Sequence, residues 1–181
     1  MHEFDLDRAL RQHETSSATE EATRSRFLAL LAANPRCLWR DCFPAHFTAS
    51  AWLVSADGER ALLLHHRKLG RWLQPGGHAD GDSDLARVAL REAAEETGLV
   101  GLSVDADVFD LDAHVIPARG DEPEHWHYDL RFVVRATASE RFIANSESRD
   151  MAWRSISDIG ADLALDDSIR RMARRWLDRR C

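Results

Sequence analysis

The sequence predicts an α/β fold in which a sheet packs between helices. Two observations support this prediction. Runs rich in β-forming residues alternate along the chain with segments of helical character, and residues 125–138 alternate between apolar and polar side chains, as in a strand with two different faces. At 181 residues the chain suits one domain with a small appendage, and its core needs no disulfide or structural metal. Strands and helices in this mixture are typical of a sheet covered by helices.

The N-terminal segment differs from the rest of the chain. Residues 1 to about 34 are polar and helical in character, with serines and threonines ahead of acidic residues and a stop at Asn34-Pro35. We predict an N-terminal helical extension at residues 1–46 and one main domain at residues 47–181. The extension could pack on the domain, cover a pocket or form a dimer contact, so a homodimer stays open.

The main domain is expected to begin with a hairpin. Two β-rich runs flank Asp57-Gly58, a pair that favours a tight turn. A long helix is expected over residues 83–97, closed by Gly98. Strands are expected over residues 107–119, 125–138 and 151–156, and a terminal helix over residues 161–180.

Composition restricts the function classes. The net charge of −7 argues against binding to polymeric nucleic acid or to an anionic membrane, but a divalent cation could still bring a small phosphorylated ligand to the protein. The polar start and the lack of a long apolar run predict a cytoplasmic protein without a membrane span. The odd number of cysteines indicates free thiols, and the spacing of Cys37, Cys42 and His46 lacks the close pairs typical of zinc sites.

The helix expected over residues 83–97 carries a cluster of acids. At 100° per residue, Glu92, Glu95 and Glu96 fall on one face with Arg91, whereas the opposite face is small and apolar. A solvated charged face is the ordinary alternative. However, Glu92 and Glu96 are an unfavourable pair of like charges, which Mg²⁺ or Mn²⁺ would relieve because these ions prefer oxygen ligands.

The stretch from Gly77 to Leu99 resembles the signature motif of the Nudix hydrolases. Gly77 opens the motif, and its tail, Arg91-Glu92-Ala93-Ala94-Glu95-Glu96-Thr97-Gly98-Leu99, matches in register. One position departs from the pattern, because Ser83 stands where the family has its first glutamate. A neighbouring aspartate could replace that glutamate, and Ser83 itself could cap the helix.

The resemblance implies a Nudix-like α/β/α sandwich with a mixed sheet and the hydrolysis of a phosphoanhydride bond in a nucleoside diphosphate linked to another group. Mg²⁺, or Mn²⁺, would be the cofactor, and the partner would be a small nucleotide-type substrate. Arg91 would orient Glu95 or another carboxylate of the cluster. Glu147 is the first candidate for the general base, followed by Glu122 and Glu124. The expected metal ligands are Gly77, Glu92, Glu95 and Glu96.

Basic and aromatic side chains are candidates for substrate contacts. One group ends a strand near the glycine pair Gly76-Gly77, and another lies on the polar side of the strand at residues 125–138, although a wet sheet face or a turn would explain both groups equally well. Among the tryptophans that could stack on a base, Trp126 is expected in the core rather than at a ligand. The candidate substrate-binding residues are His65, Arg67, Lys68, His78, His125 and His127.

Three other readings compete with this one. An isopentenyl diphosphate isomerase would need a cysteine near the glycine pair, and "LQPGGH" contains none. A degenerate Nudix domain could act as a nucleotide-binding or protein-interaction module. An acidic protein without a site would gain no thermal stability from Mg²⁺ or Mn²⁺. The sequence leaves the nucleotide open among ADP-ribose, nucleoside triphosphates, dinucleoside polyphosphates and nucleotide sugars.

Overall fold

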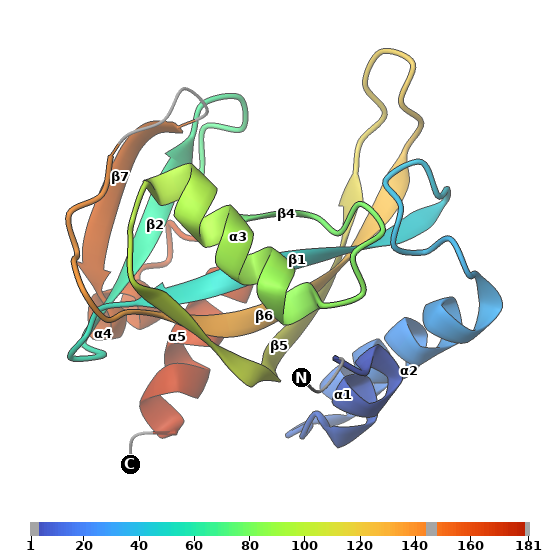
Figure 1. The fold of residues 1–181 in the computed structure, drawn as a ribbon, viewed down its shortest axis with the longest axis horizontal. Helices are drawn as coiled ribbons and strands as arrows, with labels where there is room; N and C mark the ends of the chain where they lie inside the picture. The colour runs from blue at the N-terminus through green and yellow to red at the C-terminus, as the bar shows by residue number, and fades with distance from the viewer. Residues whose placement is uncertain (1–3, 144–147, 180–181) are drawn as a thin grey trace. The chain divides into compact units, whose positions relative to one another are not determined.

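The computed structural model describes residues 4–143 and 148–179 and confirms the α/β fold with its N-terminal helices (Figure 1). Its strands form one seven-stranded sheet in the order β3-β2-β1-β6-β5, with β4 paired to β1 and β7 paired to β2. The elements are α1 Leu6–Gln12, α2 Ala18–Ala33, β1 Ala45–Val54, β2 Arg60–His66, β3 Trp72–Leu73, β4 Gly76–His78, α3 Leu85–Thr97, β5 Leu102–Ile116, β6 His125–Ala136, β7 Ser148–Ser155, α4 Ile156–Ala161 and α5 Asp167–Asp178.

The chain forms two compact units, and several strands contribute residues to both. The first unit comprises Met1–Ser50, Gly76–Ala89 and Asp105–Phe132. The second comprises Ala51–Pro75, Leu90–Val104 and Val133–Cys181. The predicted domain boundary after residue 46 stays a prediction.

In the first unit the N-terminal helices pack on strands, which is one of the three roles considered for them. Ser17 caps α2 by accepting a hydrogen bond from the backbone N–H of Glu20, and α2 ends at Ala33 as predicted. Phe27 of α2 is fully buried and stacks on Tyr128 of β6, with 4.9 Å between ring centroids. Nδ1 of His13, which follows α1, lies 3.0 Å from the carbonyl oxygen of Val108 in β5. Aromatic burial of this kind stabilises the attachment of α2, and the His13 contact holds the end of α1 against β5.

In the second unit the predicted hairpin forms between β1 and β2. Gly58 has a φ of 72°, which a residue without a Cβ adopts at little cost. β7 pairs along the length of β2 (Figure 1). An apolar cluster brings together these strands, β6 and α3; it contains Ala51, Leu53, Leu62, Leu64, Ala93, Leu99, Val134 and Met151.

The C-terminal region differs from the prediction. The helix expected over residues 161–180 begins only at Asp167, as α5, and a separate short helix that was not predicted, α4, precedes it at Ile156–Ala161. Asp162 separates them: its N–H caps the end of α4, and its side chain accepts a hydrogen bond from the N–H of Ala164. Trp176 of α5 donates from Nε1 to the carbonyl oxygen of Gly58, which fixes α5 to the hairpin turn.

Among the described residues there is no helix whose length and apolar character would let it cross a bilayer.

Candidate active site

Helix α3 carries the acidic face that the sequence predicted. The helix is unbroken from Leu85 to Thr97, and Gly98 follows it with a φ of 66°. Ala89 and Ala93 are fully buried, which confirms the apolar face. The opposite face carries Arg91, Glu92, Glu95 and Glu96.

The arginine of this face contacts a neighbouring acid. Nη2 of Arg91 donates to Oε1 of Glu92 at 3.0 Å, and the Glu92 side chain is only 17% exposed. Of the carboxylates that Arg91 was expected to orient, the structure therefore pairs it with Glu92. The contact holds one carboxylate oxygen in place, and it leaves the second oxygen of the same group for another partner.

The glycine pair before α3 is a strand rather than a flexible turn. Gly76, Gly77 and His78 form β4, and the Cα partners of the first two are Ser50 and Ala49 of β1. A Cβ on Gly76 would collide with the Ser50 side chain and lie 2.9 Å from the Ala49 carbonyl oxygen. Gly76 is therefore needed for the close approach of two strands. Gly77 was expected as a metal ligand, and that role stays a prediction.

Ser83, at the departure from the motif, does not cap α3. Oδ1 of Asp84 accepts the hydrogen bond from the N–H of Arg87, so Asp84 is the capping side chain. Ser83 is exposed and lies just before the helix.

The aspartates around Ser83 already have other partners. Asp82 accepts hydrogen bonds from the Arg87 guanidinium at 2.7 and 3.1 Å. Asp80 forms a two-pronged ion pair with Arg40. The replacement of the missing glutamate by a neighbouring aspartate therefore stays a prediction.

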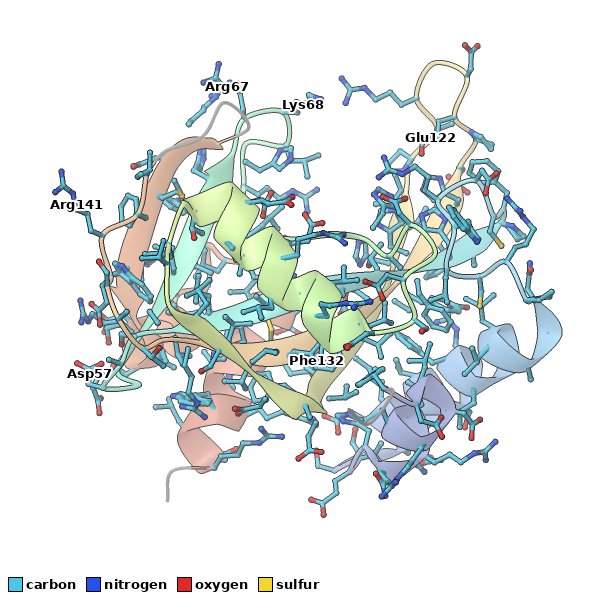
Figure 2. The ribbon with its side chains drawn as sticks, in the orientation of Figure 1. Asp57, Arg67, Lys68, Glu122, Phe132 and Arg141 are labelled. Carbon is cyan, nitrogen blue, oxygen red and sulfur yellow. The ribbon has the colours of Figure 1, made fainter. Side chains whose placement is uncertain are left out.

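The candidate residues His65, Arg67 and Lys68 lie at the end of β2 and in the turn toward β3, where Arg67 and Lys68 are exposed (Figure 2). The His65 ring packs edge-on against Trp72 at 5.2 Å between centroids. The turn itself is held by His66, whose Nδ1 accepts from the N–H groups of Lys68 and Leu69. Within residues 4–143 and 148–179 these two exposed cations form no ion pair, so an anion could reach them on this short turn.

The other three substrate candidates lie together in the first unit. His78 lies 5.0 Å from His127 between ring centroids, and His127 lies 5.1 Å from His125. Two further histidines, which were not predicted as members of a site, complete the group: His46 lies 4.8 Å and His114 5.6 Å from His127. We name His46, His78, His114, His125 and His127 the histidine cluster.

The polar face of β6 is buried, so the wet sheet face considered from the sequence is wrong for this strand. His125 is 1% exposed, and Asp129 and Arg131 are each 2% exposed. Arg131 lies 2.9 Å from Asp129 and 3.3 Å from both Asp110 and Asp112 of β5. Buried charges persist only when they are paired and hydrogen-bonded, and this network meets that condition.

Hydroxyl groups of β1 extend the same network. Thr48 donates to Asp129 at 3.0 Å, and Ser50 donates to it at 2.8 Å. The alternate residues of three strands, β1, β5 and β6, thus form one polar face, with the histidine cluster next to the ion network along each strand.

The candidates for the general base have different settings. Glu122 lies on the loop between β5 and β6 (Figure 2), and its Oε1 is 3.7 Å from Nε2 of His125. Glu122 thus belongs beside the histidine cluster. Glu124 is exposed just before β6. Glu147 lies outside the described residues.

The tryptophans considered for base stacking have different settings. Trp52 is fully buried in β1. Trp126, expected in the core, is half-buried, and the Arg26 guanidinium lies 4.6 Å from its ring centroid. This cation–π contact occupies the ring from within the protein.

The family of the chain follows from its match to known sequences. A family model described as the NUDIX domain matches residues 44–177. The chain belongs to the Nudix family. Two curated relatives, from two strains of Mycobacterium tuberculosis, carry the name "Putative 8-oxo-dGTP diphosphatase 3" and are 35% identical over 118 residues. The alignment covers 60% of this chain and 50% of theirs, so the chain spans about half the length of the curated relatives it matches.

Solved Nudix-type structures share the fold. The E. coli dihydroneopterin triphosphate pyrophosphohydrolase superposes with a TM-score of 0.61 at 16% identity, covering 74% of this chain and 95% of its own. The C. elegans Ap4A hydrolase in a binary complex gives a TM-score of 0.57 at 18% identity, covering 73% of this chain and 95% of its own. At these identities the likeness concerns the fold alone.

Proposed function

We propose that this Nudix chain is a hydrolase that cleaves a phosphoanhydride bond in a nucleoside diphosphate linked to another group, with Mg²⁺ or Mn²⁺ as cofactor. The observation that carries the proposal is the acidic face of α3, where Arg91, Glu92, Glu95 and Glu96 stand in the register of the family motif. The names of the curated relatives support a diphosphatase, and 8-oxo-dGTP is therefore one substrate to test.

The residues of this face fit a hard divalent cation. Three carboxylates lie within five positions of one helix, and Glu92 and Glu96 are one turn apart on the same side. Carboxylate oxygens are the donors that Mg²⁺ and Mn²⁺ prefer. When bound, such an ion neutralises phosphate oxygens and lowers the pKa of a coordinated water.

The side chains have distinct tasks in this proposal. Glu92 and Glu96 are the main metal ligands, and Arg91 orients Glu92 through their 3.0 Å contact. Glu95 is a third ligand or orients the attacking water. Glu147 is the first candidate for the base, and Glu147→Gln is expected to lower turnover about tenfold or more if it removes the proton from that water.

The deciding experiment assays phosphate release from a substrate panel with Mg²⁺ and with Mn²⁺. The panel contains 8-oxo-dGTP, other nucleoside triphosphates, a dinucleoside polyphosphate, ADP-ribose and a nucleotide sugar. Glu92→Gln and Glu96→Gln should each lower kcat by about a hundredfold or more, because each removes a charged ligand. Asp41→Asn, which alters an exposed acid paired with Arg36, should leave kcat unchanged.

The alternative of a degenerate binding module makes an opposite prediction for the same panel. A module would bind a nucleotide, raise its own melting temperature and release no phosphate with any member. Absence of turnover across the panel in both metals, with folded protein, would refute the hydrolase proposal.

Ser83 offers a second test of the acidic face. Asp80 and Asp82 pair with arginines and Asp84 caps the helix, which supports the view that a carboxylate at position 83 would add a metal ligand. We therefore expect Ser83→Glu to raise kcat with Mg²⁺ about tenfold or more. Ser83→Gln is the matched control, since it adds the same length without the charge. Equal activity of the two variants would show that this position has no part in metal binding.

A further inference from the structure

The histidine cluster lies outside the family motif's acidic face and is built from four strands of the first unit. His46 stands on β1, His78 on β4, His114 on β5, and both His125 and His127 stand on β6. His46, His125 and His127 each offer a nitrogen, and these three atoms lie within 4.8 Å of one another. Strands hold side chains in one orientation, so the three rings are positioned before any ligand arrives.

Two of the three imidazoles have their tautomer fixed by a backbone carbonyl. Nδ1 of His46 lies 3.2 Å from the Cys42 carbonyl oxygen, and Nδ1 of His125 lies 2.8 Å from that of Pro123. Because a carbonyl oxygen only accepts, each Nδ1 carries the hydrogen and each Nε2 keeps a lone pair. A metal-binding histidine normally has this arrangement, with its second ring nitrogen donating to a carbonyl or carboxylate.

The lone pair of His46 lacks a partner among the described residues. His46 is fully buried, and its Nε2 has no hydrogen-bond partner there. An unsatisfied buried polar atom costs about 1–3 kcal/mol. Nε2 of His125, in turn, lies 3.3 Å from Nε2 of His127, and without a metal it accepts a hydrogen bond from His127 when that ring carries its hydrogen on Nε2. A cation between these three atoms would satisfy all of them at once.

The electrostatic setting favours a cation over an anion. Burial lowers the pKa of His46. Burial also lowers the pKa of His78 to about 4 and the pKa of His127 to about 2. These three rings are therefore neutral at pH 7. Neutral imidazoles ligate metals but do not attract anions.

Acids surround the cluster more closely than bases do. Glu122 lies 3.7 Å from Nε2 of His125, and Asp112 lies 3.0 Å from Nδ1 of His114. The nearby Arg40 is neutralised by its ion pair with Asp80. Farther along the same strands, three aspartates share the Arg131 guanidinium.

We propose that His46, His125 and His127 bind one divalent ion of the Zn²⁺ class through their Nε2 atoms, with a fourth position open to water. In a tetrahedral zinc site the ligand nitrogens are about 3.3–3.4 Å apart, given Zn–N bonds of about 2.0–2.1 Å. The 3.3 Å separation between His125 and His127 already matches this value, and the remaining separations, at most 4.8 Å, require the rings to move together by about 1 Å.

This site is chemically distinct from the acidic face of α3 and does not rest on the proposed function. Imidazole nitrogens suit Zn²⁺, Co²⁺ and Ni²⁺, whereas carboxylates suit Mg²⁺ and Mn²⁺. The protein should therefore bind the two kinds of ion independently.

The test titrates tag-free protein, stripped with a chelator and desalted, with Zn²⁺ by calorimetry. Wild-type protein should bind one equivalent of Zn²⁺ and gain thermal stability. His125→Gln and His127→Gln should each weaken this binding by at least about a hundredfold, since loss of a direct ligand exceeds the 10–100-fold cost of losing an outer partner. His65→Gln, which changes a histidine of the second unit, should bind as wild type.

Two measurements keep the result decisive if a variant folds poorly. Circular dichroism checks each variant, and Co²⁺ added to wild-type protein should give the intense visible absorption of a tetrahedral nitrogen-ligated site. Retention of the Zn²⁺ equivalent in a Glu92→Gln, Glu96→Gln double variant supports the histidine site. If the double variant lost Zn²⁺ binding while the histidine variants kept it, the proposed zinc site would be wrong. Absence of Zn²⁺ binding or of the Co²⁺ band in wild-type protein would also overturn it. None of these results would contradict the proposed hydrolase.

Discussion

Replacing Arg131 with methionine should be among the most damaging single changes in the first unit. Its guanidinium is 3% exposed and lies within 3.3 Å of Asp110, Asp112 and Asp129, whose side chains are at most 16% exposed. One cation thus serves two buried carboxylates, Asp110 and Asp129, and the partly buried carboxylate of Asp112. Methionine fills a similar volume, so the variant removes charge and hydrogen bonds with little change in packing.

The expected loss of stability in Arg131→Met follows from the carboxylates that would be left without a cation. Removing one partner of a buried ion pair costs about 3–5 kcal/mol, because the other charge stays buried without compensation. For a protein of this size, that corresponds to a fall in Tm of roughly 6–20 °C. Asp129→Asn should cost less, about 1.5–3 kcal/mol, because Arg131 keeps two carboxylates and the new amide oxygen can still accept from Thr48 and Ser50.

Urea unfolding at pH 7, followed by circular dichroism, measures these differences. Arg36→Met is the matched control, since the Arg36–Asp41 ion pair has exposures of 61% and 65% and exposed pairs contribute little. We expect Arg131→Met to lower the free energy of unfolding most, Asp129→Asn less, and Arg36→Met least. If Arg131→Met were no more destabilising than the exposed control, the buried network would contribute nothing to stability and the reasoning from charge balance would fail.

Two further predictions concern the same unit. Gly76→Ala should lower the free energy of unfolding by about 1–3 kcal/mol, because its Cβ would overlap the Ser50 side chain. Gly160→Ala is the control: its Cβ would have no atom closer than 3.8 Å, so the change should be neutral or slightly stabilising. The urea midpoints of the two variants measure the difference. With chelator present, stability should fall as the pH drops from about 6.5 toward 4. The folded pKa of His78 is lowered to about 4, so the unfolded chain takes up the proton first, at a cost of roughly 2 kcal/mol at pH 5. His78→Gln should show a shallower loss of stability over this pH range, and an unchanged slope would contradict the lowered pKa.

The acidic helix was predictable because its signals are local. Apolar residues at helical spacing, Gly98 as a stop and the fixed spacing of Glu92, Glu95 and Glu96 all lie within one segment. The hairpin at Asp57-Gly58 and the end of α2 at Asn34 are local in the same way. In each case the turn or capping preference lies within the segment itself and can be recognised without knowing its neighbours in the fold.

The buried polar face was not predictable in the same manner, because it depends on which strands become neighbours. On β6 alone, alternating polar residues indicate a solvated face. The same alternation recurs at His46, Thr48 and Ser50 of β1 and at Asp110, Asp112 and His114 of β5. Once β1, β6 and β5 are adjacent, polar residues on all three strands satisfy one another and exclude water. Polar alternation in several strands at once was the signal that could have revealed this face.

The segment that links α2 to β1 contacts the loop before α3, so removing the N-terminal extension would also affect the family motif. The Leu38 carbonyl oxygen accepts from the N–H of Gly81, the Trp39 ring would collide with any side chain added there, and Arg40 pairs with Asp80. Three consecutive residues of the extension thus clamp the loop that leads into α3. Deleting residues 1–46 would remove these contacts and release that loop. A truncated protein could therefore lose activity because the motif is no longer held in place, although every residue of the motif is still present.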